Sequence, residues 1–258
     1  MPFTGSHPAI ILPLLKSNLF SVSGLIMGSM VPDFEFFITL RSHVVHGHSF
    51  WPMFWLNLPL SLLCISMYHI VVKDQLVVNL PFYFRKRFQP FLTFDWVFYF
   101  KSNYLKVICS ILIGNLSHLF MDAFTHFDGF FVQRIPLLRY LYFNIPLFDI
   151  LQYGLSLAGA FYILHFIHKM PSKKVKGDYL KRNMIVYWVL VALAILLVYV
   201  LRYDTKDYEN FGARIVFLCA GFLIGLFLTS LWNKIKNPKH EDAHITHVHK
   251  IKNSDEYI

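Results

Sequence analysis

The feature that most constrains the fold is a set of long apolar segments, each close to the length that a helix needs to cross a bilayer. Spanning the hydrocarbon core takes about 20 apolar residues. Such segments lie at roughly 51–72, 105–127, 148–168, 183–203 and 213–233. Hydrophobic residues make up 56% of the 258 positions, which is more than a soluble domain of this length carries. The sequence therefore predicts an all-α, polytopic membrane protein with about five transmembrane helices.

Two further regions are apolar without forming a simple span. Residues 7–33 contain two short apolar runs joined by the polar KSNLFS, so we expect an N-terminal helical hairpin whose broken backbone is buried in protein. Residues 89–104 are aromatic and mixed in polarity, which favours a segment at the membrane interface. The first residues lack a basic region and a small-residue cleavage site, so no cleaved signal peptide is predicted.

Positive charge orients the predicted spans. Lys and Arg are concentrated in residues 73–106, in residues 169–182 and in the tail after residue 233. Alternating spans place all three groups on one face, and the positive-inside rule makes that face the cytoplasm. The sequence thus predicts a multi-pass membrane protein with a cytoplasmic C-terminus. This topology and anionic lipids account for the net charge of +9, and no nucleic-acid-binding motif accompanies the charge.

The domain organisation follows from the same pattern. We expect one helical membrane domain over residues 1–233, of which 161–233 supply the last two spans. Residues 234–258 are predicted to be a solvated, disordered tail, although its histidines have a spacing that would bind metal on a helix. The cysteines lie in apolar segments without CxxC spacing and are predicted to be small core residues; they are Cys64, Cys109 and Cys219.

Histidines and carboxylates gather on the predicted outer side of the membrane. The segment GNLSHLFMDAFTH spaces His118, Asp122 and His126 four residues apart, so they share one face of a helix. The same spacing presents two ligands to one zinc ion in HExxH helices. Ionisable side chains within an apolar segment are costly and are usually functional. The structural alternative is a His–Asp pair that only joins helices, and His126, near the interface, suits a surface position equally well.

The motif GSMVPDFEFF adds carboxylates on the same side. Pro32 is expected to end a helix, with Asp33 at its mouth, where the carboxylate can bind a cation or orient a ligand histidine. Glu35 would point the other way from an extended backbone. It therefore suits a supporting group or a general base, and a solvated loop carboxylate is an equally good interpretation.

Two motifs add histidines. In SHVVHGHSF, Gly47 can turn His46 and His48 inward, whereas His43 is the first of the three to be assigned to the surface. In SHP, Ser6 suits an N-cap and the following proline suits the first helical turn, which places His7 at a helix start. A plain surface histidine is the alternative for His7.

Together these motifs predict a divalent-metal centre that opens near the outer leaflet. Imidazoles and carboxylates suit zinc or another first-row ion, whereas an iron–sulfur cluster or a structural zinc finger needs thiolates. The candidate ligands are His7, Asp33, His46, His48, His118, Asp122 and His126. This set has room for one or two ions, and a two-ion site clamps a phosphoryl group and lowers the pKa of a water that it binds. Asp33 and Glu35 are the candidate catalytic groups that would orient or deprotonate that water.

Three arginines on the same side could hold a phosphate, although anchoring at the membrane interface explains each of them better. They are Arg41, Arg134 and Arg139.

As a set, the motifs resemble a bacterial membrane family known as domain of unknown function 4184. The resemblance covers about residues 1–160 and rests on MPFTGSHPAIILPL, GSMVPDFEFF, HGHSF followed by NLPLSLL, GNLSHLFMDAFTHFDGFF and IPLFDILQYGLSLAG. That family is similar to membrane-bound metal-dependent hydrolases and, more distantly, to the all-helical zinc-dependent phospholipase C. The resemblance implies ligand roles for His7, Asp33, His48, His118 and Asp122, and it matches His46 and His126 less closely.

With this resemblance, the leading prediction is a metal-dependent hydrolase of the bacterial inner membrane that acts on a lipid or a lipid-linked phosphoester. A metal-ion or proton-coupled transporter is the alternative, because intramembrane His and Asp also build ion pathways. A transporter favours ionisable groups that reach both faces and internal repeats, and neither pattern is evident in this sequence. A non-catalytic membrane protein with a structural metal is the third possibility. Membrane lipid is the predicted partner, nucleic acid is not, and the sequence fixes no oligomeric state.

Overall fold

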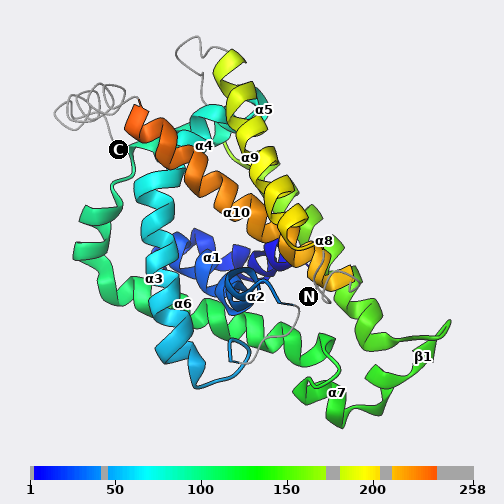
Figure 1. Ribbon diagram of the computed structural model, residues 1–258. Coiled ribbons are helices and arrows are strands. Elements are labelled where there is room, and N and C mark those ends of the chain that lie inside the picture. Colours follow the sequence, from blue (N-terminus) through cyan, green and yellow to red (C-terminus); the bar gives the residue numbers. More distant parts are fainter. Residues whose placement is uncertain (1–2, 42–45, 173–180, 204–210, 237–258) are drawn as a thin grey trace.

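A computed structural model of the chain describes residues 3–41, 46–172, 181–203 and 211–236 (Figure 1). Six helical stretches of this described part are long and apolar enough to cross a membrane. Its strands are β1 (Leu141–Tyr142) and β2 (Ile145–Pro146), which pair antiparallel as a hairpin. The prediction of an all-α, polytopic protein is therefore confirmed.

The helices are, in chain order, η1 (Thr4–Lys16), α1 (Val22–Met30), η2 (Val31–Asp33), α2 (Phe34–Thr39), η3 (Met53–Asn57), α3 (Leu58–Met67), η4 (Tyr68–Val72), α4 (Lys73–Asn79), α5 (Phe82–Phe88), η5 (Gln89–Thr93), α6 (Trp96–Thr125), α7 (Phe130–Arg134), η6 (Pro136–Arg139), α8 (Leu147–Lys169), α9 (Lys181–Leu201) and α10 (Phe211–Lys236).

The N-terminal region extends further than the predicted hairpin. The 3-10 helix η1 is followed by α1, as the two short apolar runs indicated, and α1 ends at Met30. The chain then continues through the 3-10 turn η2 into α2 instead of leaving the helix at Pro32. Proline lacks an N–H but fits the first turn of a new helical segment, so it changes the helix geometry without ending the span. Residues Val22–Thr39 thus form a sixth candidate span where about five were predicted.

The predicted interfacial segment 89–104 is also helical. It contains η5 and the first turns of α6, which begins at Trp96 after Asp95 caps the helix by accepting a hydrogen bond from Phe98 N at 3.0 Å. Asn103 has non-helical backbone angles and marks a kink. The straight part of α6 after this kink coincides with the central span predicted from residue 105.

Glycines bring α1 and α6 into direct backbone contact. A Cβ added at Gly28 would lie 2.2 Å from Ile111 O, and one added at Gly114 would lie 2.5 Å from Leu25 O. Gly24 and Gly28 have the four-residue spacing of small residues that lets helices approach closely in membranes. The end of α1 is therefore fixed against the second half of α6, where His118 lies.

The basic segments of the described chain meet at one end of the helices. Arg87 of α5 donates to His168 O at the end of α8, over 3.2 Å, and Lys234 near the end of α10 donates to Ile70 O, over 2.9 Å. This end is opposite the His48 turn along the span Met53–Asn79. The grouping agrees with the sequence, and its assignment to the cytoplasm stays a prediction. The tail from residue 237 on and His43 lie outside the described residues.

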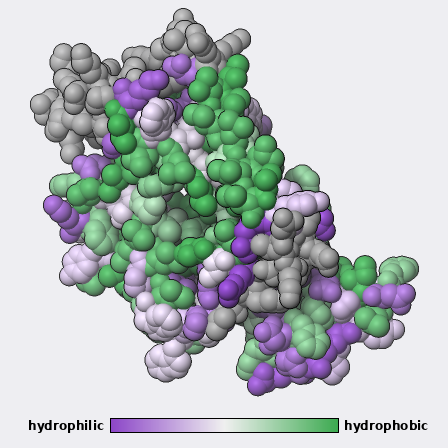
Figure 2. Space-filling view, in the orientation of Figure 1, coloured by the Kyte–Doolittle hydropathy of each residue, from purple (hydrophilic) through white to green (hydrophobic). Residues whose placement is uncertain are grey.

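The surface between the ends is strongly apolar. Figure 2 shows hydrophobic side chains over much of the face that carries α9 and α10, with hydrophilic side chains gathered toward the ends of the view. Many large apolar side chains on the helices are exposed, such as Phe161, Leu196 and Leu228. A surface of this kind suits a lipid environment, in which apolar side chains need no further protein to cover them.

Candidate metal centre

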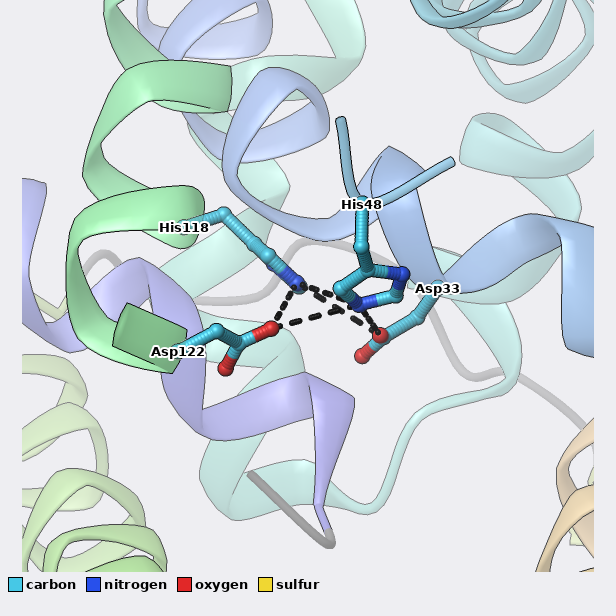
Figure 3. A group of neighbouring side chains, drawn as sticks. All are labelled: Asp33, His48, His118 and Asp122. Carbon is cyan, nitrogen blue, oxygen red and sulfur yellow. Dashed lines mark hydrogen bonds and ion pairs between the residues drawn. The ribbon is translucent and has the colours of Figure 1, made fainter. Parts of the chain in front are cut away.

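Four side chains from three separate segments meet at one end of the helical assembly (Figure 3). His118 and Asp122 lie on one face of α6, one turn apart, as their spacing predicted. Asp33 ends the 3-10 turn η2, and His48 lies in the turn before η3. In Figure 3 all four side chains point toward one another. One ligand atom from each lies within 4.8 Å of those from the other three.

The distances within this group are those of atoms that share a cation. His48 Nε2 lies 3.1 Å from Asp33 Oδ1 and 3.2 Å from Asp122 Oδ2. His118 Nε2 lies 3.5 Å and 3.0 Å from the same two oxygens. Two ligand atoms bound to one ion at about 2.0–2.2 Å are themselves about 3–3.5 Å apart in a tetrahedral arrangement. These four nitrogen–oxygen distances therefore fit a shared ion, and all four ligand atoms lie within 4.8 Å of one another.

The hydrogen bonding of His118 shows why the group needs a positive centre. Its Nδ1 lies 2.8 Å from Ser29 O, and because a carbonyl only accepts, Nδ1 must donate. In the neutral ring Nε2 then carries a lone pair. That lone pair faces two carboxylate oxygens and His48 Nε2, which is 3.2 Å away. A ligand histidine in a metal site is oriented in this way, with its other nitrogen donating to a backbone carbonyl.

The group is buried but open on one edge. The side chains of His118, Asp33 and Asp122 are almost fully covered, whereas His48 is 26% exposed. His126, at the end of α6, is 35% exposed, and its Nδ1 lies 3.4 Å from Asp122 Oδ1. These two histidines are therefore the side chains by which the group meets the molecular surface.

A network of amides holds the turn that carries His48. Asn57 Nδ2 donates to Gly47 O and to Asn115 Oδ1, each over 2.9 Å, and so ties the turn to α6. A Cβ at Gly47 would lie 2.4 Å from Pro32 O, so this position must be glycine for the turn to approach η2. Sequence reasoning missed Asn57. Its signal was a buried amide inside an apolar span, one of the costly polar groups that mark functional regions in membranes.

Glu35 and His46 lie beside the group without joining it. The backbone at Glu35 is helical, not extended, and its carboxylate accepts hydrogen bonds from His46 N at 3.1 Å and Gly47 N at 2.7 Å. The His46 ring is 54% exposed and lies 3.5 Å from Glu35 Oε1. Glu35 thus supports the turn, which is one of the roles predicted for it, and the His46 side chain points away from Asp33 and Asp122.

His7 reaches the group from η1. Its ring stacks on that of His118, with centroids 3.8 Å apart and an interplanar angle of 16°. Its Nε2 lies 3.9 Å from Asp33 Oδ2 and 4.0 Å from Asp122 Oδ1. Ser6 is not the N-cap that its position suggested. It donates instead to Ser156 O of α8 over 2.6 Å, which places the His7 ring beneath α6.

The pKa values of His7 and His48, which lie outside the candidate spans, follow from these contacts. Burial, together with the neighbouring His118, lowers the pKa of His7 to about 3, so this imidazole is neutral at physiological pH. Burial also acts to lower the pKa of His48, but hydrogen bonds and attraction from Asp122 and Asp33 outweigh it and raise the pKa to about 9. The space between the two carboxylates therefore favours positive charge.

The donor set suits a first-row divalent ion. Two imidazole nitrogens and two carboxylate oxygens, buried and supported by further hydrogen bonds, are ligands that zinc and its neighbours accept. Two of the arginines proposed for phosphate binding have structural partners. Arg139 donates to the carbonyl oxygens of Val132 and Gln133, and Arg134 packs on Phe130 and donates to its carbonyl oxygen. Their contacts favour the anchoring interpretation.

Comparison with known proteins places the chain in a family. A family model described as a domain of unknown function (DUF4184) matches residues 1–231. The match extends past the first 160 or so residues that carry the recognisable motifs, so the last two spans are also part of it. No curated protein and no solved structure matches the chain. The chain therefore belongs to the family of the domain of unknown function 4184.

Proposed function

We propose that this protein is a divalent-metal-dependent hydrolase that acts on a lipid or lipid-linked phosphoester at the membrane surface. The observation that carries the proposal is the convergence of His118, His48 and two carboxylates, with His118 Nε2 directed at both carboxylates. A divalent ion bound there would polarise a phosphoryl oxygen and lower the pKa of a bound water. The resemblance of the motifs to those of membrane-bound metal-dependent hydrolases, and more distantly of zinc-dependent phospholipase C, supports the same proposal.

Different residues of the chain have different roles in such a site. Asp33, His48, His118 and Asp122 bind the ion, and His48 and His126 border the opening through which substrate enters. Glu35 acts through the backbone of the turn that it holds, and Asn57 does the same from the other side. A part for Asp33 in orienting or deprotonating water stays a prediction.

The surroundings of the opening favour a lipid substrate. Trp51 follows His48 by three residues, Phe127 follows His126 directly, and both aromatic side chains are exposed. Aromatic residues at the ends of spans lie at the level of the lipid headgroups. A phosphoester at that depth would reach the group without leaving the membrane interface. The outer leaflet of the inner membrane is the location that the family resemblance and the charge distribution together predict.

The test uses the full chain purified in lipid nanodiscs. Its metal content is measured first, and hydrolysis of phosphodiester and phospholipid substrates is then followed with chelator and after addition of Zn²⁺ or Mn²⁺. We expect chelator-sensitive hydrolysis that is lost in Asp122→Asn, while His165→Gln, on the exposed surface of α8, keeps it. Ion flux into liposomes without hydrolysis would favour a transporter instead. A retained metal with neither activity would favour a structural role.

A further inference from the structure

His7 is a buried ligand-type side chain that a single-ion site leaves without a role. Neither of its ring nitrogens has a hydrogen-bond partner among the described residues, although the ring is almost completely covered. Asp33 Oδ2, the carboxylate oxygen that faces His7, likewise lacks a hydrogen-bond partner in this part of the chain. Leaving buried polar atoms without hydrogen-bond partners is unfavourable, so their presence on facing side chains calls for a shared partner.

The two aspartates present different oxygens to different histidines. Asp33 Oδ1 and Asp122 Oδ2 face His48 and His118, and they complete the group described above. Asp33 Oδ2 and Asp122 Oδ1 face His7 Nε2, at 3.9 and 4.0 Å. Asp122 Oδ1 also lies 3.4 Å from His126 Nδ1. Each carboxylate is thus oriented as a bridge between two sets of nitrogen ligands.

We propose a second metal position formed by His7, His126, Asp33 Oδ2 and Asp122 Oδ1, with the two aspartates bridging it to the first. The stacking of His7 on His118 supports this arrangement. The nearly parallel rings, with centroids 3.8 Å apart, both direct Nε2 at the same two carboxylates, a spacing that would let two neighbouring ions share those carboxylates. Two-ion hydrolytic sites have separations of about 3.5–4 Å. The ligand is a first-row divalent cation such as Zn²⁺ or Mn²⁺, which accepts imidazole and carboxylate together.

The N-terminal segment is built to present His7. Ser6 Oγ donates to Ser156 O, and a Cβ at Gly159 would lie 3.0 Å from Ser6 O, so η1 lies directly against α8. This contact joins the SHP and LSLAG segments, although 150 residues separate Ser6 from Ser156. The second position therefore depends on η1 and α8 in addition to η2 and the end of α6, whereas the first depends on η2, α6 and the His48 turn.

Metal stoichiometry tests the inference, which rests on the metal binding of the proposed function but not on hydrolysis. The full chain in nanodiscs is stripped with chelator and titrated with Mn²⁺, and bound Mn²⁺ per chain and the EPR spectrum are recorded. We expect two ions per chain and the spectrum of a magnetically coupled Mn²⁺ pair. His7→Phe keeps the ring stack but removes the ligand. It should lower the affinity for the second ion by more than about 100-fold, which exceeds the usual effect of losing a supporting group. The EPR spectrum should then show one uncoupled Mn²⁺ ion per chain.

His126→Gln changes a partly exposed side chain and is the second variant in case His7→Phe fails to fold. It should lower the affinity for the same second ion. His69→Phe is the matched control, because His69 also stacks on a ring, that of Trp96, at the other end of the helices. It should retain two coupled ions. One ion at saturation in the unmodified chain, or two coupled ions in His7→Phe and His126→Gln, would overturn the second position while leaving the proposed hydrolase intact. An unmodified chain that binds no Mn²⁺ or Zn²⁺ would overturn both.

Discussion

Two histidines in apolar helices, His118 and His69, lie at opposite ends of the molecule and have different partners. His69 Nε2 is 2.8 Å from the Ser23 hydroxyl, and its ring stacks on Trp96. His118 is bonded to a backbone carbonyl through Nδ1 and faces two carboxylates and a second histidine through Nε2. His69 thus joins helices, whereas His118 has the contacts of a ligand. The comparison shows that converging carboxylates, and not a histidine within a span, distinguish a metal site from a packing contact.

Removing Asp122 should have the largest effect, because this carboxylate contacts His118, His48 and His126. In Asp122→Ala the remaining histidines lose their shared anionic partner, so we expect loss of both metal retention and hydrolysis. Atomic emission analysis of the purified variant, together with a lipid hydrolysis assay, measures both. Full activity with normal metal content in this variant is incompatible with the proposed site.

The pair His118→Ala and His69→Ala tests the comparison itself. His118→Ala should lower metal affinity by at least about 100-fold, beyond the loss seen for a supporting group. His69→Ala should keep the metal and instead destabilise the fold by about 1–3 kcal/mol through lost packing on Trp96. Metal titration and thermal unfolding in detergent separate the two outcomes. Equal metal affinities in the two variants would show that His118 contributes no more to metal binding than His69 does.

Gly47→Ala should have an intermediate effect, which we expect on metal affinity alone. A Cβ at this position would lie 2.4 Å from Pro32 O, so the turn must move away from η2 and carry His48 with it. We expect metal affinity to fall by about 10–100-fold, as when supporting groups of metal sites are altered. Gly154→Ala is the matched control, because a Cβ there meets nothing within 4 Å. The prediction fails if both variants bind metal equally well in the same titration.

Asn57→Ala should have the smallest effect of the series. It removes the donor to Gly47 O and Asn115 Oδ1 but leaves every ligand and the Glu35 contacts in place. We expect metal affinity to fall by about 10-fold, with a faster dissociation of the ion because the His48 turn is less firmly held. Stopped-flow chelator competition measures that rate. An unchanged rate would mean that the amide network serves stability alone.

Much of the fold could be predicted because hydrophobic length is a strong signal. The predicted central span matches α6 after the kink at Asn103, and the last two spans match α9 and α10. The continuation of α1 through Pro32 into α2 could not be predicted in the same way. A proline is compatible with the end of one helix and with the first turn of the next, and only packing decides between them.

The site was predictable in so far as it depends on local spacing. The four-residue interval between His118 and Asp122 fixes a shared helix face, and the structure places both side chains inward. Contacts between residues far apart in the sequence could not be predicted. Whether Glu35 faces the group or the turn depends on the backbone conformation at residues 34–39, and the role of Asn57 depends on a contact with Asn115, 58 residues away. Such pairings are set by how the helices pack.

The coordination of the bound ion is the most direct test of the central claim, that His48, His118 and two aspartates share a cation. X-ray absorption spectroscopy of the zinc-loaded protein in nanodiscs reports the ligands of the metal. The expected spectrum has only nitrogen and oxygen neighbours at about 2.0–2.2 Å, with the multiple scattering of at least two imidazoles that disappears in part when His118 is replaced. Sulfur neighbours at about 2.3 Å, or a spectrum that is unchanged in the His118 variant, would contradict the claim.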